Sequence, residues 1–264
     1  MISLNACTKY FHRGSVNEVK ALSGITLQIE EGEFTTVIGS NGAGKSTLLN
    51  AVAGTFALDA GTITIGNRNV TGWPEYKRAK LIARVFQDPL LGTCPSATIE
   101  QNLALAMRRG KRRGLGFGVR SEYNSMFRRE LEKIGLGLEQ RLQDRAGLLS
   151  GGQRQALTML MATLVRPEVL LLDEHIAALD PKTAIQILSL TEEMVSSQGL
   201  TTLMITHNMK HAINFGNRLI MLHQGRIILD VKGDEKASLT VEDLLQKFYL
   251  VQGEELANDS MLLT

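Results

Sequence analysis

Short apolar runs recur along the chain and are separated by stretches with helical spacing. Four runs, each of four to six mostly apolar or β-branched residues, lie at 34–38, 81–86, 169–172 and 202–206. Runs of this length, bounded by polar residues or glycine, are typical of buried strands. Because these strands alternate with helical patterns, the sequence predicts an α/β fold with a parallel sheet.

Further strands are punctuated by glycine and asparagine. Those before and after the 34–38 run predict a small N-terminal antiparallel β subdomain beside the core. Two more, near the end of the chain, flank a glycine and predict a hairpin. The expected strands are Ile2–Phe11, Ala21–Glu30, Gly61–Gly66 and Asn69–Val70 in the subdomain, and Arg218–Leu222 and Arg226–Val231 in the hairpin.

Helical spacing dominates from Thr98 to Gly137, with glycine breaks, and returns from Val241 to Leu250. We therefore expect one large unit over 1–235 that contains an inserted helical subdomain at about 90–165. A short C-terminal helical tail should occupy 236–264.

The composition is ordinary for a globular protein, with 44% hydrophobic and 21% charged residues. No apolar stretch approaches the roughly 18 residues that a membrane span needs. The start of the chain does not resemble a secretion signal, so we expect a cytosolic protein. Cys7 and Cys94 are too few and too isolated to predict a disulfide framework or a metal site.

Basic residues are concentrated in one segment. Between Arg108 and Arg129 there are eight basic residues and the single acid Glu122, a balance of +7, while the remaining residues carry −5. A nucleic-acid-binding protein more often spreads basic residues and aromatics over a whole face. A cluster beside a membrane would meet anionic headgroups. A solvated surface run remains the alternative.

A glycine-rich segment follows the first core strand. The residues from Gly39 to Thr47 match the pattern G-x-x-x-x-G-K-[ST] at every fixed position. A helix follows and should end at Gly54. On such a strand-to-helix turn, backbone N–H groups converge and the helix N-terminus favours anions. The expected ligand is therefore a polyphosphate, with Lys45 at its β- and γ-phosphates and the Ser46 hydroxyl on Mg²⁺. The predicted phosphate-binding residues are Ser40, Asn41, Gly42, Ala43, Gly44, Lys45, Ser46 and Thr47.

Polar residues also follow the other core strands. Asp173 and Glu174 end one strand, His207 follows another, and Gln87 follows a third. In an open α/β sheet such strand ends line the ligand crevice. An aspartate at this place, downstream of a phosphate loop, is typical of the second Mg²⁺-associated group of P-loop NTPases. The adjacent glutamate is able to accept a proton from water.

One helix start allows two interpretations. Ser150 and Gln153 stand three residues apart, as in a capping box, before a helix that should end near Pro167. The pattern is therefore that of a well-capped helix. A helix start also offers N–H groups to an anion, so a ligand-binding role is equally compatible with the local sequence.

Taken in order, these motifs resemble the ATP-binding subunit of ABC transporters. Leu-Ser-Gly-Gly-Gln upstream of an apolar strand ending in Asp-Glu is highly specific to that family. The resemblance spans about Met1 to Val231. Its elements, in chain order, are the phosphate loop, Gln87, Leu-Ser-Gly-Gly-Gln at 149–153, Asp173-Glu174, Ala-Leu-Asp at 178–180 and His207.

The resemblance implies a P-loop NTPase core and a head-to-tail homodimer with two ATP molecules between the subunits. Each ATP would contact the phosphate loop of one subunit and residues 150–153 of the other. Asp180 would touch the opposite site. Phe11 would stack on the adenine, with Tyr10 as the alternative. The residues contributed across the interface would be Ser150, Gly151, Gly152 and Gln153.

The resemblance also implies catalytic roles around a Mg²⁺ ion. Glu174 would be the general base for the attacking water, and His207 would sense the γ-phosphate, while Lys45 reaches the β- and γ-phosphates. Gln87 would couple the metal site to a membrane partner. The implied metal-associated residues are Ser46, Gln87 and Asp173.

The implied partners are a second copy of the chain and transmembrane permease subunits, with an extracytoplasmic substrate-binding protein acting indirectly and no nucleic acid. The location would be the cytoplasmic face of the cell membrane. The stretch from Asp173 to Asp180 resembles a group whose permeases look like amino-acid importers. His175 departs from the proline or alanine of many members, so a proton relay and a packing role both remain open.

Two other functions were considered. Soluble ABC ATPases that act on ribosomes or DNA carry tandem cassettes or a long coiled coil. Here one cassette is present, and Lys45 and Ser150 lie only 105 positions apart without sustained heptads. A non-hydrolysing binding module is disfavoured because Lys45, Asp173, Glu174 and His207 are all present.

Overall fold

The computed structural model describes residues 1–111, 118–119 and 121–261. In this part of the chain, one sheet has the strand order β10-β9-β3-β8-β7-β6 and a second has the order β2-β1-β4-β5. The larger sheet consists of β3 (Phe34–Gly39), β6 (Ile82–Val85), β7 (Val169–Asp173), β8 (Thr201–Ile205), β9 (Arg218–His223) and β10 (Arg226–Lys232). The smaller sheet consists of β1 (Ile2–Phe11), β2 (Val19–Ile29), β4 (Ala60–Ile65) and β5 (Arg68–Asn69).

The larger sheet confirms the predicted α/β class. Strands β9, β3, β8, β7 and β6 run parallel, and β10 lies antiparallel at the edge. The smaller sheet is antiparallel between all its neighbouring strands, as the sequence predicts. The carboxyl ends of β3, β8, β7 and β6 therefore face the same edge, where the candidate polar residues follow.

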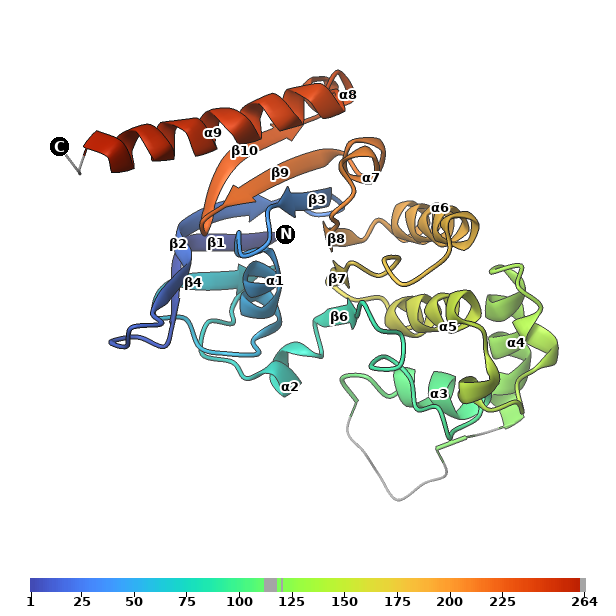
Figure 1. Ribbon diagram of the computed structural model, residues 1–264. Coiled ribbons are helices and arrows are strands. Elements are labelled where there is room, and N and C mark those ends of the chain that lie inside the picture. The colour runs from blue at the N-terminus through green and yellow to red at the C-terminus, as the bar shows by residue number, and fades with distance from the viewer. Residues whose placement is uncertain (112–117, 120, 262–264) are drawn as a thin grey trace.

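Figure 1 shows α3, α4 and α5 gathered on the side away from β1, β2 and β4. Helix α6 ends at Gln198, where Gly199 supplies its left-handed cap (φ 57°). The helices are α1 (Lys45–Ala53), α2 (Glu75–Arg78), α3 (Ile99–Ala106), α4 (Asn124–Glu132), α5 (Gly151–Thr163), α6 (Pro181–Gln198), α7 (Met209–Asn214), α8 (Asp234–Ala237) and α9 (Val241–Met261).

The α/β core and the helical insert each have their own cluster of buried apolar side chains. Leu48, Leu49 and Val52 of α1 are buried against both sheets. Around α3, α4 and α5 a different cluster includes Leu103 and Phe127, both 0% exposed. Each such side chain contributes about 1.5–3 kcal/mol when fully buried. The helical insert therefore has its own packing, although its bounds of 90–165, and those of the tail at 236–264, remain predictions.

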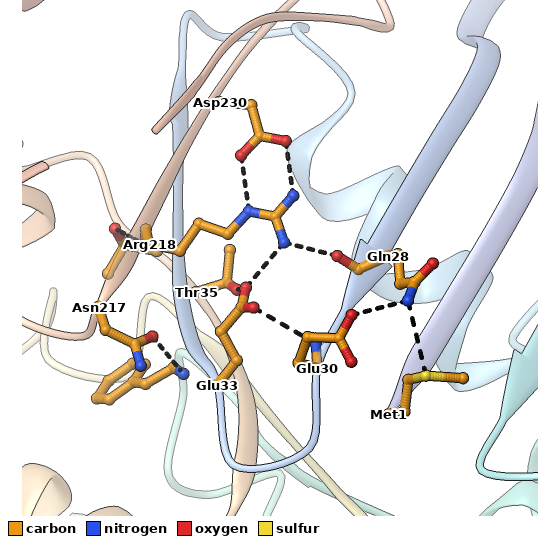
Figure 2. A network of polar contacts seen from close by, with 10 residues as sticks. Met1, Gln28, Glu30, Glu33, Thr35, Asn217, Arg218 and Asp230 are labelled. Atoms are coloured by element: carbon orange, nitrogen blue, oxygen red, sulfur yellow. Dashed lines mark hydrogen bonds and ion pairs between the residues drawn. The ribbon is translucent and has the colours of Figure 1, made fainter. Parts of the chain in front are cut away.

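Arg218 ties the smaller sheet to the edge of the larger one (Figure 2). Its guanidinium makes two bonds of 2.6 Å to the carboxylate of Asp230, on β10. The same side chain bonds Glu33 at 2.9 Å and the backbone oxygen of Gln28 at 2.6 Å. The carboxylate of Asp230, together with that of Glu33, raises the pKa of Arg218 above its ordinary value despite burial. The network fixes the turn between β2 and β3, and thereby the start of the strand that leads into the phosphate loop.

The described part of the chain contains no helix that is both long enough and apolar enough to cross a membrane.

Candidate nucleotide site

The loop between β3 and α1 requires glycine at two places. Gly39 and Gly44 have φ values of 151° and 100°. A Cβ atom at Gly39 would lie 2.2 Å from the backbone oxygen of Leu222, and one at Gly44 would lie 2.4 Å from that of Ala21. The loop is therefore held against strands of both sheets, and no larger residue fits at either glycine.

The first turn of α1 is left open for an anion. Its N-cap, Gly44, provides no side-chain hydrogen bond, and the first turn contains no acid. By contrast, Thr98, Ser150 and Asp180 cap the starts of α3, α5 and α6 with their own side chains. Uncapped N–H groups at a helix N-terminus, together with its positive dipole end, favour a phosphate.

Lys45 lies inside this loop. It is 5% exposed, and its Nζ donates hydrogen bonds of 2.8 Å to the backbone oxygens of Gly39 and Ser40. Burial lowers the pKa of Lys45, and the charge of Glu174 partly offsets that effect. The buried ammonium and the open helix start fit a polyphosphate ligand of the kind that the sequence predicts.

Glu174 and His207 meet at the ends of adjacent strands. Oε1 of Glu174 contacts Nε2 of His207, and the backbone N–H of Glu174 donates to Ile205 at 3.1 Å. Glu174 has a φ of 46°, a conformation that is uncommon for a residue with a side chain. Both side chains line a cavity of about 610 Å³ beside the starts of α6 and α7. The structure therefore brings two of the predicted catalytic residues into direct contact.

The candidate metal residues offer oxygen donors at the same sheet edge. Ser46 is exposed in the first turn of α1, and Gln87 is exposed two positions after β6 ends. Asp173 ends β7, where its Oδ2 pairs with Nη2 of Arg84 at 2.6 Å. Hydroxyl, amide and carboxylate oxygens suit Mg²⁺, which usually takes few protein ligands and completes its shell with water and phosphate oxygens. The described residues hold no cluster of three or more His, Cys, Asp or Glu side chains able to bind a metal.

The remaining candidates form a second group, at the starts of α5 and α6. Ser150 caps α5 and forms the predicted capping box with Gln153. A Cβ atom at Gly152 would lie 2.3 Å from Cγ2 of Thr183, on α6. Asp180 caps α6 by accepting a hydrogen bond of 3.1 Å from the N–H of Thr183, and these contacts lower the pKa of Asp180. Ser150 and Asp180 thus belong to one packed unit that is distinct from the phosphate loop.

Phe11 lies at the end of β1. Its ring meets the ring of Phe56 edge to face, with centroids 5.5 Å apart, and Nζ of Lys9 lies 5.6 Å from the Phe11 centroid. Tyr10, the alternative, has Arg13 beside its ring instead. Both aromatic residues therefore remain candidates for stacking, and Phe11 has a defined aromatic neighbour.

His175 points away from the catalytic edge. It is 2% exposed, and its Nε2 lies 3.1 Å from Oγ1 of Thr191, on α6. Burial lowers the pKa of His175 to about 4, so the ring is neutral at physiological pH. This geometry supports the packing role over the proton relay.

The ABC transporter family model matches residues 22–177 of the chain. The chain belongs to the ABC transporter family. As a member of that family it is an ATP-binding cassette whose ATPase activity is coupled to transport. The resemblance drawn from the sequence motifs is therefore confirmed.

Similar proteins agree with this assignment. The chain is 50% identical to a tyrosine transport ATP-binding protein of Clostridioides difficile (strain R20291) over 85% of this chain and 89% of that protein. It is 33% identical to an aliphatic sulfonates import ATP-binding protein of Agrobacterium fabrum (strain C58 / ATCC 33970), over 80% and 74%. A dimeric ATP-binding cassette in a post-hydrolysis state with ADP and Pi matches with a TM-score of 0.74 and 29% identity, over 88% and 98%. These names favour transport over an action on ribosomes or DNA.

The basic segment is only partly described. Arg112, Arg113 and Arg120 lie outside the described residues. Arg109 does not belong to a solvated run, because its Nη1 donates at 2.7 Å to the backbone oxygen of Ala162, on α5. A leaflet contact by this segment therefore stays a prediction.

Sequence reasoning missed Arg84, which bonds a candidate metal residue. The available signal was a charged residue inside the otherwise apolar run at 81–86. A charge in a buried strand usually has a partner, and here the partner is Asp173. Only the pairing of β6 with β7 identifies it.

Proposed function

We propose that this chain hydrolyses Mg²⁺-ATP as one of two copies of a cassette that drives amino-acid import through a separate permease. The observation that carries the chemistry is the contact between Glu174 and His207, at strand ends beside the phosphate loop. The substrate class is inferred from the 50% identity to a tyrosine transport ATP-binding protein. An aromatic amino acid is accordingly the first substrate to test.

Each protein group has a distinct task in this proposal. The loop N–H groups and Lys45 hold the β- and γ-phosphates, while Ser46, Asp173 and Gln87 surround the metal. When bound, Mg²⁺ neutralises charge on the phosphate oxygens. Glu174 orients the attacking water and accepts its proton, and His207 holds the Glu174 carboxylate in place and contacts the γ-phosphate.

A second copy completes each site. Ser150, Gly151, Gly152 and Gln153 form their own unit against α6, and α5 presents a helix N-terminus outward from it. In the proposed head-to-tail dimer, this N-terminus faces the γ-phosphate held by the other subunit. Asp180, which belongs to the same unit, lies at the opposite site, and Phe11 stacks on the adenine. The similarity to a dimeric cassette supports the presence of a second copy.

The permease is expected to dock on the helical insert. A groove of about 270 Å³ lies between the core and the insert, and Phe86, Gly92 and Arg109 are among the residues that line it. Phe86 directly precedes Gln87, so the groove and the metal site share one loop. We place the bound cassette at the cytoplasmic face of the membrane, with an extracytoplasmic substrate-binding protein on the other side of the permease.

Uptake by cells tests the proposal. Strains that express the wild-type chain or Lys45→Ala, together with the permease through which the cassette acts, are given labelled tyrosine, methionine or an aliphatic sulfonate. We expect ATP-dependent tyrosine uptake with the wild type only, because Lys45→Ala removes the charge that holds the phosphates. Sulfonate uptake without tyrosine uptake would overturn the substrate class, and unchanged ATP affinity in purified Lys45→Ala would overturn the site.

A further inference from the structure

Arg84 bridges two elements of the nucleotide site. It lies on β6, opposite Leu171 of the neighbouring strand β7. Its Nη2 bonds Oδ2 of Asp173 at 2.6 Å, and its Nη1 bonds Oδ1 of Asn50 at 2.7 Å. The side chains of Arg84 and Asp173 are only 15% and 17% exposed, so this ion pair is shielded from bulk solvent. One planar guanidinium therefore fixes the end of β7 relative to α1.

Its contacts lead to all three candidate metal residues. Asp173 is bonded directly. Asn50 lies one turn after Ser46 on α1, and residues four apart share one face of a helix. The Cζ atom of Arg84 lies 4.8 Å from the ring centroid of Phe86, which directly precedes Gln87. The guanidinium thus contacts one candidate metal residue, Asp173, directly and lies beside residues that are close in sequence to the other two.

The same side chain also reaches the groove between the core and the insert. Arg84 and Phe86 line one wall of that groove, and Gly92, Arg109 and Met161 lie among the residues of the others. Nε of Arg84 is buried and, within the described residues, has no hydrogen-bond partner. Because this Nε–H donor of Arg84 is unsatisfied, a change in the groove can alter the hydrogen bonding of Arg84.

We propose that Arg84 is a positioning residue that couples the occupancy of this groove to the affinity of the metal site. This inference rests on the proposed function, in which Mg²⁺ binds between Ser46, Asp173 and the phosphates. Arg84 holds Asp173 in the orientation that the metal needs, and Phe86 transmits the state of the groove to Arg84. Because such coupling is reciprocal, metal-nucleotide binding also changes the groove wall that a permease would meet.

Position and charge predict opposite effects, which makes the inference testable. A guanidinium near a metal repels it, so its removal would tighten metal binding if charge alone mattered. If Arg84 acts by holding Asp173, its removal weakens metal binding instead. Loss of a partner that orients a metal ligand typically costs about 10- to 100-fold in affinity.

The experiment measures Mn²⁺ binding to the isolated subunit in the presence of ADP, by electron paramagnetic resonance. We expect Arg84→Met and Arg84→Lys each to weaken Mn²⁺ binding at least tenfold, because Lys keeps the charge but does not bridge Asp173 and Asn50. Arg109→Met is the matched control: it lines the same groove but bonds Ala162, and its Mn²⁺ affinity should stay within twofold of the wild type. Unchanged or tighter binding in Arg84→Met would overturn the proposal.

A second measurement tests the connection to the groove. Phe86→Leu keeps an apolar wall but removes the ring on which the guanidinium lies. We expect about threefold weaker Mn²⁺ binding in the wild-type background and no further loss in Arg84→Met, since contacting residues in one network are non-additive. Equal losses in both backgrounds would show that the groove acts independently of Arg84.

Thermal denaturation identifies any variant that fails to fold. If Arg84→Met unfolds, Asn50→Leu takes its place, because it removes the hydrogen bond that fixes the guanidinium to α1, and the guanidinium then holds Asp173 less firmly. Weakened Mn²⁺ binding supports the inference, and wild-type binding overturns it. If the wild-type protein itself binds no Mn²⁺-ADP, the proposed function fails. If the wild type binds and the Arg84 variants match it, only the inference fails.

Discussion

The carboxylate of Glu174 contacts Nε2 of His207 across the ends of the neighbouring strands β7 and β8. The backbone of Glu174 adopts a φ of 46°, which costs of order 1–3 kcal/mol for a residue with a side chain. Its N–H is satisfied by Ile205, so the surrounding sheet maintains this conformation. Strand order, strain and the histidine contact together aim one carboxylate at the sheet edge that carries the phosphate loop.

Replacement of Glu174 by Gln should stop hydrolysis while nucleotide binding persists. A positioned general base typically contributes about 10²- to 10⁴-fold, and an amide does not accept the proton. With turnover stalled, ATP should hold the two copies together. Steady-state ATPase assays and size-exclusion chromatography with and without ATP measure both effects.

His211→Ala is the control for this variant, because His211 lines the same cavity on α7 but its ring meets that of Phe215 edge to face. It should retain near wild-type turnover. A Glu174→Gln protein that hydrolyses ATP at the wild-type rate would remove Glu174 from the role of base.

Gly152→Ala should destabilise the fold, whereas Gly151→Ala should be tolerated. The added methyl group at Gly152 would lie 2.3 Å from Cγ2 of Thr183, but at Gly151 it would meet Leu179 at an ordinary 3.4 Å. Overpacking of this kind costs about 1–3 kcal/mol. Thr183→Ser removes the clashing methyl group and should restore the stability of Gly152→Ala. Urea denaturation of Gly151→Ala, Gly152→Ala and the double variant Gly152→Ala/Thr183→Ser measures their free energies of unfolding. Equal stability of the two single alanine variants would contradict the packing argument.

Mixtures of damaged subunits should recover function if the site is shared. Ser150→Arg blocks the start of α5, and Lys45→Ala removes the phosphate ligand, so each homodimer is inactive. A heterodimer of the two variants holds one intact site and one doubly damaged site. ATP-dependent dimerisation should therefore return as the two are titrated together. No recovery at any ratio would place both residues in the same site of one chain.

Lys236 should make stability rise at alkaline pH. It is 2% exposed, and its Nζ donates to the backbone oxygens of Phe215 and, at 2.7 Å, Gly216. Burial lowers the pKa of Lys236 to about 8, with partial compensation by the charge of Glu192. An unfolded lysine titrates near 10.4. Between about pH 8 and 10.4 the unfolded chain therefore holds a proton that the folded chain has released, and stability increases with pH in that window.

The free energy of unfolding, measured in urea at pH 7, 8 and 9.5, tests this prediction against Lys236→Met. The methionine variant has no group to titrate at this place, and all other ionisable groups are shared. The difference between the two proteins should stay flat up to pH 8 and then shift in favour of the wild type. A constant difference over the whole range would mean that Lys236 titrates normally.

The local pattern of the sequence was sufficient for much of this protein. The apolar runs predicted the core strands, and the G-x-x-x-x-G-K-[ST] pattern placed the phosphate loop between a strand and a helix. The Ser150 to Gln153 spacing predicted a capping box that the structure contains. These features depend on residues within one or two turns of each other, so spacing alone determines them.

Tertiary structure decided which distant residues meet. The order β3-β8-β7-β6 places Arg84 beside Asp173, 89 positions later, and joins Glu174 to His207. The packing of the turn after β7 against α6 buries His175 on Thr191, which spacing left open between a relay and a packing role. Strand order and helix packing depend on side chains throughout the core, so a short local motif does not predict them. The ion-pair partner of Arg84 could therefore be identified only once the structure showed which strand lies beside β6.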